Sequence, residues 1–348
     1  MKVAKTIFIV SVLIACFAIL WIGAFGEIRP HVENTEPTVT DATLGQTTAP
    51  TTQPTEDTTE PTIQPTEEVP KYYPIDNDKK YVGVYINDPQ ELDLFENGTN
   101  IIGWFDTFDN PSEAKISMCL DNHEGVAFIT LEPQGMSIYQ IPSGKYDEQI
   151  INYLTLLSAG DRVNTELFIR FAHEMEMRPS YEEPWYGWQG YDGDAYINAW
   201  KHVVDLGREY APNVKWVWSP NRADKYTTRH YPGDDYVDYV GLTLNNYRSM
   251  HDSFENFYLD EGSRESLEAY NKPIIFGEVA EHCSDEDQKN EYLASIFEYI
   301  KNDDNVIGFM YLNKDIREGR EYKISDNETQ LATFVEKAME LINCEKQN

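Results

Sequence analysis

Two glutamates stand where short apolar runs of the sequence end, a position that is costly for a charge unless something uses it. Glu174 follows the run Leu167–Ala172 and His173, and Glu278 closes the run Lys272–Gly277. Hydrolysis of a glycosidic bond needs two carboxyl groups across that bond, about 5–5.5 Å apart for retention of the anomeric configuration and wider for inversion. The two glutamates are therefore a candidate catalytic pair if the fold brings them face to face.

Polar and aromatic residues gather at the ends of other apolar runs. Asn221 follows the run Val214–Trp218, and Tyr247 follows the next run along the chain. Trp185 and Trp188 lie in the loop after the first glutamate. Amides and carboxylates hydrogen-bond to hydroxyl groups, and indole rings stack on apolar faces, so these residue types suit a carbohydrate. The alternative interpretation of the two tryptophans is that they cover a core.

A metal site is the alternative use of His173, Glu174 and Glu278. The His-Glu pair lacks the H-E-x-x-H spacing of zinc proteases, because residue 177 is Met. The four cysteines show neither C-x-x-C nor Cys/His metal spacing. The sequence therefore predicts no catalytic metal and no organic cofactor.

The elements that must position these residues are apolar runs that alternate with amphipathic segments. We expect strands over Tyr81–Tyr85, Ile101–Phe105, Val126–Leu131, Leu167–Ala172, Val214–Trp218, Tyr236–Leu242, Ile274–Phe276 and Ile307–Leu312. We expect helices over Gln149–Leu157, over Tyr196–Tyr210, from an N-cap at Ser284, and over Leu331–Ile342. Eight strands that alternate with helices predict a (β/α)₈ barrel of the α/β class. A doubly wound sheet is the alternative, although no Gly-rich phosphate loop follows the first strand.

In such a barrel the working residues lie at the C-terminal ends of the strands. The fourth and seventh strands lie roughly opposite each other, so Glu174 and Glu278 can face one another across the mouth. Because side chains alternate along a strand, Arg170 shares the inner side with Ala172 and Glu174. We expect Arg170 and Tyr247 to stabilise the Glu278 carboxylate where they contact it.

Five motifs occur in order along the chain. They are Thr130-Leu131-Glu132-Pro133, Arg170-Phe171-Ala172-His173-Glu174-Met175, Trp216-Val217-Trp218-Ser219-Pro220-Asn221, Asp238-Tyr239-Val240-Gly241-Leu242 and the run from Lys272 to Glu278. Through this ordered set, the region 81–342 resembles glycoside hydrolase family 26, which belongs to a clan of retaining (β/α)₈ enzymes. The family usually continues His-Glu-Met with Asn-Gly, whereas Glu176-Met177 follow here.

The resemblance implies a role for each of the residues singled out. It makes Glu174 the acid/base and Glu278 the nucleophile. It also implies that His173 and Tyr247 position the sugar or the nucleophile. The resemblance implies, in addition, that two aromatic residues are platforms for sugar rings, namely Trp185 and Trp188.

The resemblance also sets the expected activity. Members of the family act on β-mannans and on β-1,3-1,4-glucans. We expect an endo-acting, retaining glycosidase that cleaves β-1,4-linked mannan or glucan, with Arg170 and Asn221 among its substrate-binding residues. The family's aromatic residue on the eighth strand is usually Trp, and Tyr311 stands there, so it joins this set. A non-catalytic, cell-surface polysaccharide-binding barrel is the alternative.

The first 70 residues differ in composition from the rest. Residues 7–25 are an unbroken apolar run, long enough to span a bilayer, and the preceding lysines predict an N-terminus that stays inside. Cleavage near Ala24 or lipid attachment at Cys16 are alternatives, and each places the remainder outside the cell membrane. The Thr/Pro/Glu-rich stretch predicts a disordered linker. The expected organisation is a transmembrane anchor or signal (1–27), a linker (28–70) and a catalytic domain (71–348).

The charge of the chain limits its partners. It has 28 Lys and Arg against 60 Asp and Glu, a formal net charge of −32. Such a chain repels phosphate backbones, so the sequence predicts no nucleic-acid partner. We expect a polysaccharide substrate, membrane contact only through the N-terminal segment, and a monomeric catalytic domain.

Overall fold

The computed structural model describes residues 71–95, 97–177, 186–190, 193–224, 227–318 and 320–344. The expected anchor at 7–25 and the expected linker at 28–70 lie outside these residues. Within the described ranges, no helix has the length and apolar character needed to cross a membrane. The anchor and the linker therefore remain predictions from the sequence.

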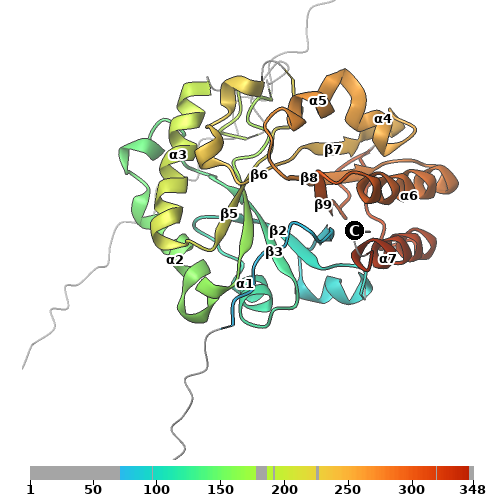
Figure 1. The fold of residues 1–348 in the computed structure, drawn as a ribbon, viewed down its shortest axis with the longest axis horizontal. Helices are drawn as coiled ribbons and strands as arrows, with labels where there is room; N and C mark the ends of the chain where they lie inside the picture. The colour runs from blue at the N-terminus through green and yellow to red at the C-terminus, as the bar shows by residue number, and fades with distance from the viewer. Residues whose placement is uncertain are drawn as a thin grey trace, which may run out of the picture. The chain divides into compact units, whose positions relative to one another are not determined.

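Parallel strands form a closed barrel at the centre of the described chain (Figure 1). Their bounds are β1 Tyr81–Tyr85, β2 Ile101–Thr107, β3 Val126–Glu132, β4 Leu167–Phe171, β5 Val214–Trp218, β6 Tyr239–Val240, β7 Thr243–Asn246, β8 Ile274–Glu281 and β9 Val306–Tyr311. β1 pairs with β9, and β6 pairs with both β5 and β8. β6 and β7 thus share one position of an eight-stranded barrel, and the predicted (β/α)₈ fold is confirmed.

Two of the predicted strands differ from the observed ones by more than two residues at an end. The sixth, predicted over Tyr236–Leu242, is split into β6 and β7 around Gly241. A Cβ atom on Gly241 would lie 2.1 Å from the backbone oxygen of Ile275, so the split strand approaches β8 more closely than a side chain allows. The seventh, predicted to end at Phe276, runs on to Glu281, which places the second glutamate inside a strand rather than at its end.

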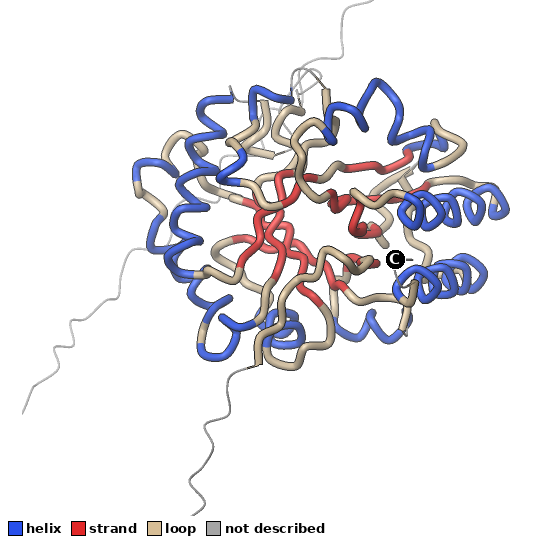
Figure 2. Tube along the Cα trace, in the orientation of Figure 1, coloured by secondary structure: helices blue, strands red, loops and turns tan. Residues whose placement is uncertain are grey.

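Helices surround the strands (Figure 2). The α-helices are α1 Glu113–Leu120, α2 Asp147–Ser158, α3 Gly193–Tyr210, α4 Phe254–Leu259, α5 Ser263–Glu268, α6 Glu286–Asn302 and α7 Glu328–Ile342. The four predicted helices correspond to α2, α3, α6 and α7. The N-cap of α6 is Asp285 rather than Ser284, because the Asp285 carboxylate accepts the backbone N–H of Gln288 at 3.0 Å.

Along the inner face of β4, apolar core residues give way to a charged residue toward the mouth of the barrel. Phe168 lies among apolar side chains inside the barrel, and Arg170 takes the next inward position toward the C-terminal end of the strand. A Cβ atom on Gly277 would lie 2.4 Å from Arg170 Nε. Glycine at 277 therefore leaves the space in which the arginine side chain reaches β8.

A short segment at the start of the described chain is tied to the opposite end of the barrel. The Glu166 carboxylate accepts the Tyr72 hydroxyl and, at 2.8 Å, the backbone N–H of Ile75. The Glu166 backbone N–H donates to the Tyr73 carbonyl at 3.0 Å. Glu166 stands directly before β4, so the segment 72–75 supports the strand that leads to the first glutamate.

Shortening the chain should show what this segment contributes. A chain that begins at Asp76 loses these three hydrogen bonds and a fourth, which the Tyr73 backbone N–H donates to the Asn164 carbonyl at 2.8 Å. We expect its free energy of unfolding to fall by about 2–6 kcal/mol. A chain that begins at Lys71 keeps these bonds and serves as the matched control. Urea unfolding of both measures the difference. Equal midpoints and slopes for the two chains would show that the segment adds no stability.

Candidate active site

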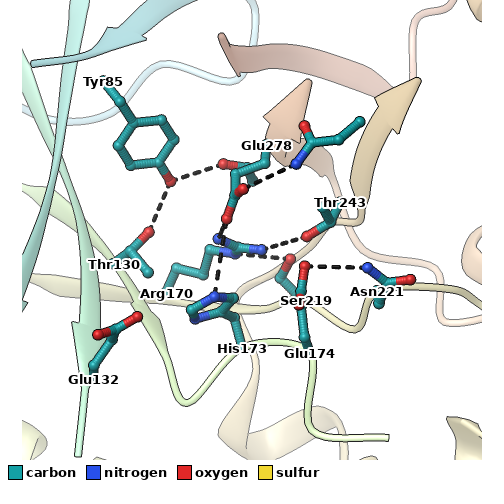
Figure 3. A network of polar contacts seen from close by, with 12 residues as sticks. Tyr85, Thr130, Glu132, Arg170, His173, Glu174, Ser219, Asn221, Thr243 and Glu278 are labelled. Carbon is teal, nitrogen blue, oxygen red and sulfur yellow. Dashed lines mark hydrogen bonds and ion pairs between the residues drawn. The ribbon is translucent and has the colours of Figure 1, made fainter. Parts of the chain in front are cut away.

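Glu278 lies on the inner side of β8 and is held by two donors (Figure 3). Arg170 Nη1 donates to Glu278 Oε1 at 2.6 Å, and Asn245 Nδ2 donates to Glu278 Oε2 at 3.2 Å. The side chain is only 6% exposed. Both carboxylate oxygens therefore accept a hydrogen bond, which fixes the orientation of the side chain.

Arg170 is fully buried and makes three contacts from one guanidinium group. Besides Glu278, it donates through Nε to Ser219 Oγ at 3.0 Å and through Nη2 to Thr243 Oγ1 at 2.7 Å. Burial lowers the pKa of Arg170, but the neighbouring Glu278, Tyr85 and Glu174 together outweigh burial and raise the pKa above its usual value. The predicted contact between Arg170 and the second glutamate is thus present, and its geometry is fixed from strands β5 and β7.

Glu174 is presented by an unusual backbone conformation just after β4. Ala172 has a φ of 43° and Glu174 a φ of 54°, in a region that non-glycine residues seldom adopt. The Glu174 backbone N–H donates to the Ser219 carbonyl at 2.9 Å, which ties this turn to the end of β5. Asn221 Nδ2 donates to Glu174 Oε1 at 3.1 Å. Such local strain commonly marks functional sites and here aims the carboxyl group at the mouth of the barrel.

The two glutamates and His173 lie close together. Each offers one atom, a carboxylate oxygen or a ring nitrogen, and these atoms lie within 4.8 Å of one another. Loss of hydration raises the pKa of Glu174, and the charge of Glu278 raises it further, while Arg170 acts in the opposite direction. One carboxyl group is thus biased toward its protonated form beside a second that is paired with an arginine. This is the division that acid catalysis next to a nucleophile requires.

His173 is a buried, neutral neighbour of the pair. Its Nε2 lies 3.9 Å from Glu278 Oε1, and burial, followed by the charge of Arg170, holds its pKa well below the usual value. One of the three potential metal ligands, Glu278, already accepts a hydrogen bond from the Arg170 guanidinium group, so the positive charge at this point comes from the chain itself. The donor set therefore favours chemistry by two carboxyl groups over metal chemistry.

Of the two predicted tryptophan platforms, Trp185 lies outside the described residues. The structure corrects the prediction for Trp188. Trp188 is 2% exposed, and its indole N–H donates to the His173 carbonyl at 2.7 Å. Its ring stacks on Tyr186 with a centroid distance of 4.5 Å. Trp188 therefore supports the turn that carries His173 and does not present a face to a sugar. Its place in a polar loop gave no sign that the loop folds back onto the barrel.

Stability measurements should confirm the supporting role of Trp188. We expect Trp188→Ala to lower the free energy of unfolding by about 3–5 kcal/mol, as for other buried large aromatics. Trp188→Phe keeps an aromatic ring but loses the N–H donor, so a smaller loss is expected. Denaturant unfolding of both variants tests this. An unaltered unfolding curve with a raised KM would restore the platform interpretation.

Tyr311 is also placed differently from the prediction. It is fully buried in β9 with its ring 5.7 Å from that of Phe334 in α7, and its hydroxyl donates to the Tyr322 carbonyl at 2.9 Å. The side chain faces the helix layer rather than the barrel mouth, so it cannot bind substrate there. The prediction took the residue type at this strand without the alternation of its side chains. Tyr322, which Tyr311 supports, lines the cleft instead.

An open cleft of about 340 Å³ extends from Glu174 along the ends of β7 and the loop that follows. Of the predicted residues it includes Glu174, Asn221 and Tyr247. The guanidinium groups of Arg248 and Arg320 lie 4.8 and 5.0 Å from the centroid of the Tyr247 ring. The predicted contact between Tyr247 and the second glutamate is not among the hydrogen bonds of the described residues; the amide of residue 245 takes that place.

Further residues around the pair were not predicted from the sequence. Tyr85, the last residue of β1, donates to the Gly277 carbonyl at 2.8 Å and shares a 2.7 Å hydrogen bond with Thr130. Thr243 opens β7 and contacts Arg170. The rule that strand ends face the mouth would have identified Tyr85. Thr243 could not be found in this way, because the predicted sixth strand ended at Leu242.

Comparison with known proteins finds a family whose sequence model matches part of the chain. The sequence model described as "Glycosyl hydrolase family 26" matches residues 138–310. "Endoglucanase H" of Acetivibrio thermocellus is 31% identical over 179 residues, which are 46% of this chain and 18% of that protein. "Beta-1,3-xylanase TXYA" of a Vibrio species is 23% identical over 207 residues, 51% of this chain and 41% of that protein. The chain thus spans less than half the length of these curated relatives.

Solved structures show the same architecture. A GH26 beta-mannanase from Bacteroides ovatus aligns with a TM-score of 0.56 and 13% identity, over 77% of this chain and 92% of that one. A modular endo-beta-1,4-mannanase from Cellulomonas fimi aligns with a TM-score of 0.55 and 16% identity, over 75% of this chain and 71% of that one. At these identities the likeness concerns the fold alone.

Proposed function

We propose, on the premise that the chain belongs to glycoside hydrolase family 26, that it is a retaining, endo-acting hydrolase of β-linked polysaccharide. The observation that carries the proposal is the pair of carboxyl groups at the barrel mouth. Glu174 and Glu278 bring carboxylate oxygens within 4.8 Å of each other, which matches the narrow separation of retaining enzymes.

The proposed reaction proceeds in two displacements. Glu278 attacks the anomeric carbon while Glu174 gives its proton to the departing glycosidic oxygen, so a glycosyl ester forms and the leaving sugar departs neutral. Glu174, now ionised, takes a proton from water, whose oxygen attacks the anomeric carbon and releases Glu278. Each step inverts the configuration, and the product retains it. Arg170 holds Glu278 in line for attack throughout.

The substrate is proposed at the level of a β-linked glycan. Relatives are described as an endoglucanase, a beta-1,3-xylanase and a mannan endo-1,4-beta-mannosidase, and the family resemblance of the sequence favours β-1,4-linked mannan or glucan. A panel of soluble β-mannan, β-1,4-glucan, β-1,3-1,4-glucan and β-1,3-xylan tests the proposal. Release of reducing ends, with early products of several sizes, would support an endo-acting hydrolase.

Two further measurements on this panel separate the alternatives. Proton NMR of the first product should show the β-anomer before mutarotation, and the α-anomer would overturn the retaining mechanism. Binding of a glycan without any release of reducing ends would instead indicate a polysaccharide-binding barrel without catalysis.

The location of the enzyme is proposed from residues 7–25 alone. We infer that this apolar run holds the catalytic domain at the outer face of the cell membrane, or directs its secretion. Fractionation of expressing cells tests this. The full chain should accompany the membranes or the medium, and a chain without residues 1–27 should remain in the soluble cell fraction.

A further inference from the structure

A second polar pocket of about 580 Å³ adjoins the cleft on the side of α6. Met250 and His251 belong to the walls of both, so the loop that carries these residues separates the two hollows. Its volume falls in the range of ligand pockets in proteins, ~300–1,000 Å³. Neither the reaction described above nor its residues use this pocket.

Two buried polar atoms in the pocket lack a partner in the protein. Glu281 and Tyr292 line the pocket, and each is 2% exposed. Glu281 Oε1 accepts the Ser249 hydroxyl at 3.1 Å, but neither Glu281 Oε2 nor the Tyr292 hydroxyl makes a hydrogen bond. Unpaired buried polar atoms are costly, and native proteins keep few of them. Their joint presence in one pocket is the mark of a site built for a ligand's polar groups.

The chemistry of the pocket selects a hydroxylated, uncharged ligand. Carboxyl groups of Glu281, Asp252 and Glu291 line it together with the Gln288 amide and a tyrosine hydroxyl. These carboxyl groups are not gathered as metal ligands, since the only such group of three among the described residues is at the catalytic pair. Burial raises the pKa of Glu281 to about 7, so near neutral pH this carboxyl group can either accept or donate a hydrogen bond.

The loop that divides the two hollows is held in a strained form. Arg248 and Ser249 have φ values of 55° and 49°, and the Ser249 hydroxyl anchors the loop to Glu281 and to the His282 carbonyl. Met250, at the tip, is 68% exposed although it is apolar. The loop thus presents an apolar side chain at the boundary between the two polar hollows.

The geometry points to a distal subsite in the pocket between the loop 249–252 and α6, which holds a neutral sugar unit of the same glycan that is cleaved at Glu174 and Glu278. The sugar's hydroxyl groups pair with Glu281 Oε2 and with the Tyr292 hydroxyl. This inference rests on the proposed function. It adds that the enzyme gains from glycans long or branched enough to reach the second pocket.

The test is the ratio of kcat/KM for a long oligosaccharide to kcat/KM for a short aryl glycoside. Tyr292→Phe removes only a hydroxyl group that has no protein partner, so folding is not impaired. We expect the ratio to fall about 3- to 10-fold, as for loss of one hydrogen bond. Glu281→Gln keeps the acceptor for Ser249 but cannot ionise, and we expect the ratio to fall for it as well.

Tyr258→Phe is the matched control. Tyr258 is also buried, its hydroxyl also has no partner, and it lines neither hollow. Its ratio should equal that of the unaltered enzyme. An unaltered ratio for Tyr292→Phe overturns the subsite while the hydrolase stands. If no glycan is hydrolysed, the proposed function fails, and the affinity of the chain for the panel glycans then tests the subsite. Equal affinities for the unaltered chain and for Tyr292→Phe would overturn the subsite too, and so would the absence of any binding.

Discussion

Glu278→Ala is expected to lose hydrolysis of both polysaccharide and activated aryl glycosides, by on the order of 10⁴-fold or more. Without the nucleophile the first displacement cannot occur, whatever the leaving group. Glu174→Ala should lose about 10²–10⁴-fold on polysaccharide, yet still form the glycosyl ester from an aryl glycoside whose leaving group needs no proton. Rates on the two substrate classes measure the difference between the variants.

Azide should distinguish the two roles by stereochemistry. In Glu174→Ala, azide attacks the glycosyl ester and gives the β-glycosyl azide, since two inversions have occurred. In Glu278→Ala, azide occupies the empty space and displaces the leaving group directly, which gives the α-glycosyl azide. NMR of the products identifies the anomer. The same anomer from both variants would contradict this assignment of roles.

The pH dependence follows from the same assignment. Activity requires Glu174 protonated, and burial together with the charge of Glu278 raises its pKa. The raised pKa extends activity to higher pH, and activity is lost as pH rises through it. The alkaline limb should vanish for Glu174→Ala acting on an aryl glycoside.

Should Glu278→Ala keep its activity, Glu132 becomes the candidate nucleophile. It is a partly buried carboxyl group at the end of β3.

The strands could be predicted where burial alone decides the pattern. β1 and β5 have the bounds that their apolar runs predicted, because both are continuous sequences of residues that pack on each side. The prediction of β8 stopped too early at Phe276, since Gly277 and Glu278 end the apolar run. The strand continues because Arg170 compensates the inward carboxylate, and sequence patterns do not show such a long-range partner.

The sequence predicted which residues form the site, but not the direction in which each side chain points. Glu174, Glu278 and Arg170 were identified because strand ends and side-chain alternation place them near the mouth. Trp188 and Tyr311 were misplaced because residue type does not reveal which way a loop folds or which face a strand turns to the core. These directions depend on packing between segments far apart in the chain.

Arg170→Met is expected to have the second-largest effect, on both activity and stability. The buried pair of Arg170 and Glu278 is joined at 2.6 Å, and removing one partner leaves a charge that costs about 3–5 kcal/mol. Glu278 would also lose the donor that holds its Oε1 in place. We expect a fall in kcat of at least 10²-fold, because a displaced carboxylate is a poor nucleophile. Urea unfolding and kcat measure the two effects.

Two further variants distinguish the effect of breaking the pair of Arg170 and Glu278 from the effect of losing any arginine. Arg162→Met breaks the partly exposed pair with Asp121, also 2.6 Å apart, and a hydrogen bond to the Leu156 carbonyl at 2.9 Å. It should cost about 1–2.5 kcal/mol with activity retained. The double variant Arg170→Met with Glu278→Gln removes both charges. It should regain much of the stability lost by the single variant, because no unpaired charge remains, and it should stay inactive. If the double variant is no more stable than Arg170→Met, then Ser219 and Thr243, and not the glutamate, are the contacts through which Arg170 stabilises the barrel.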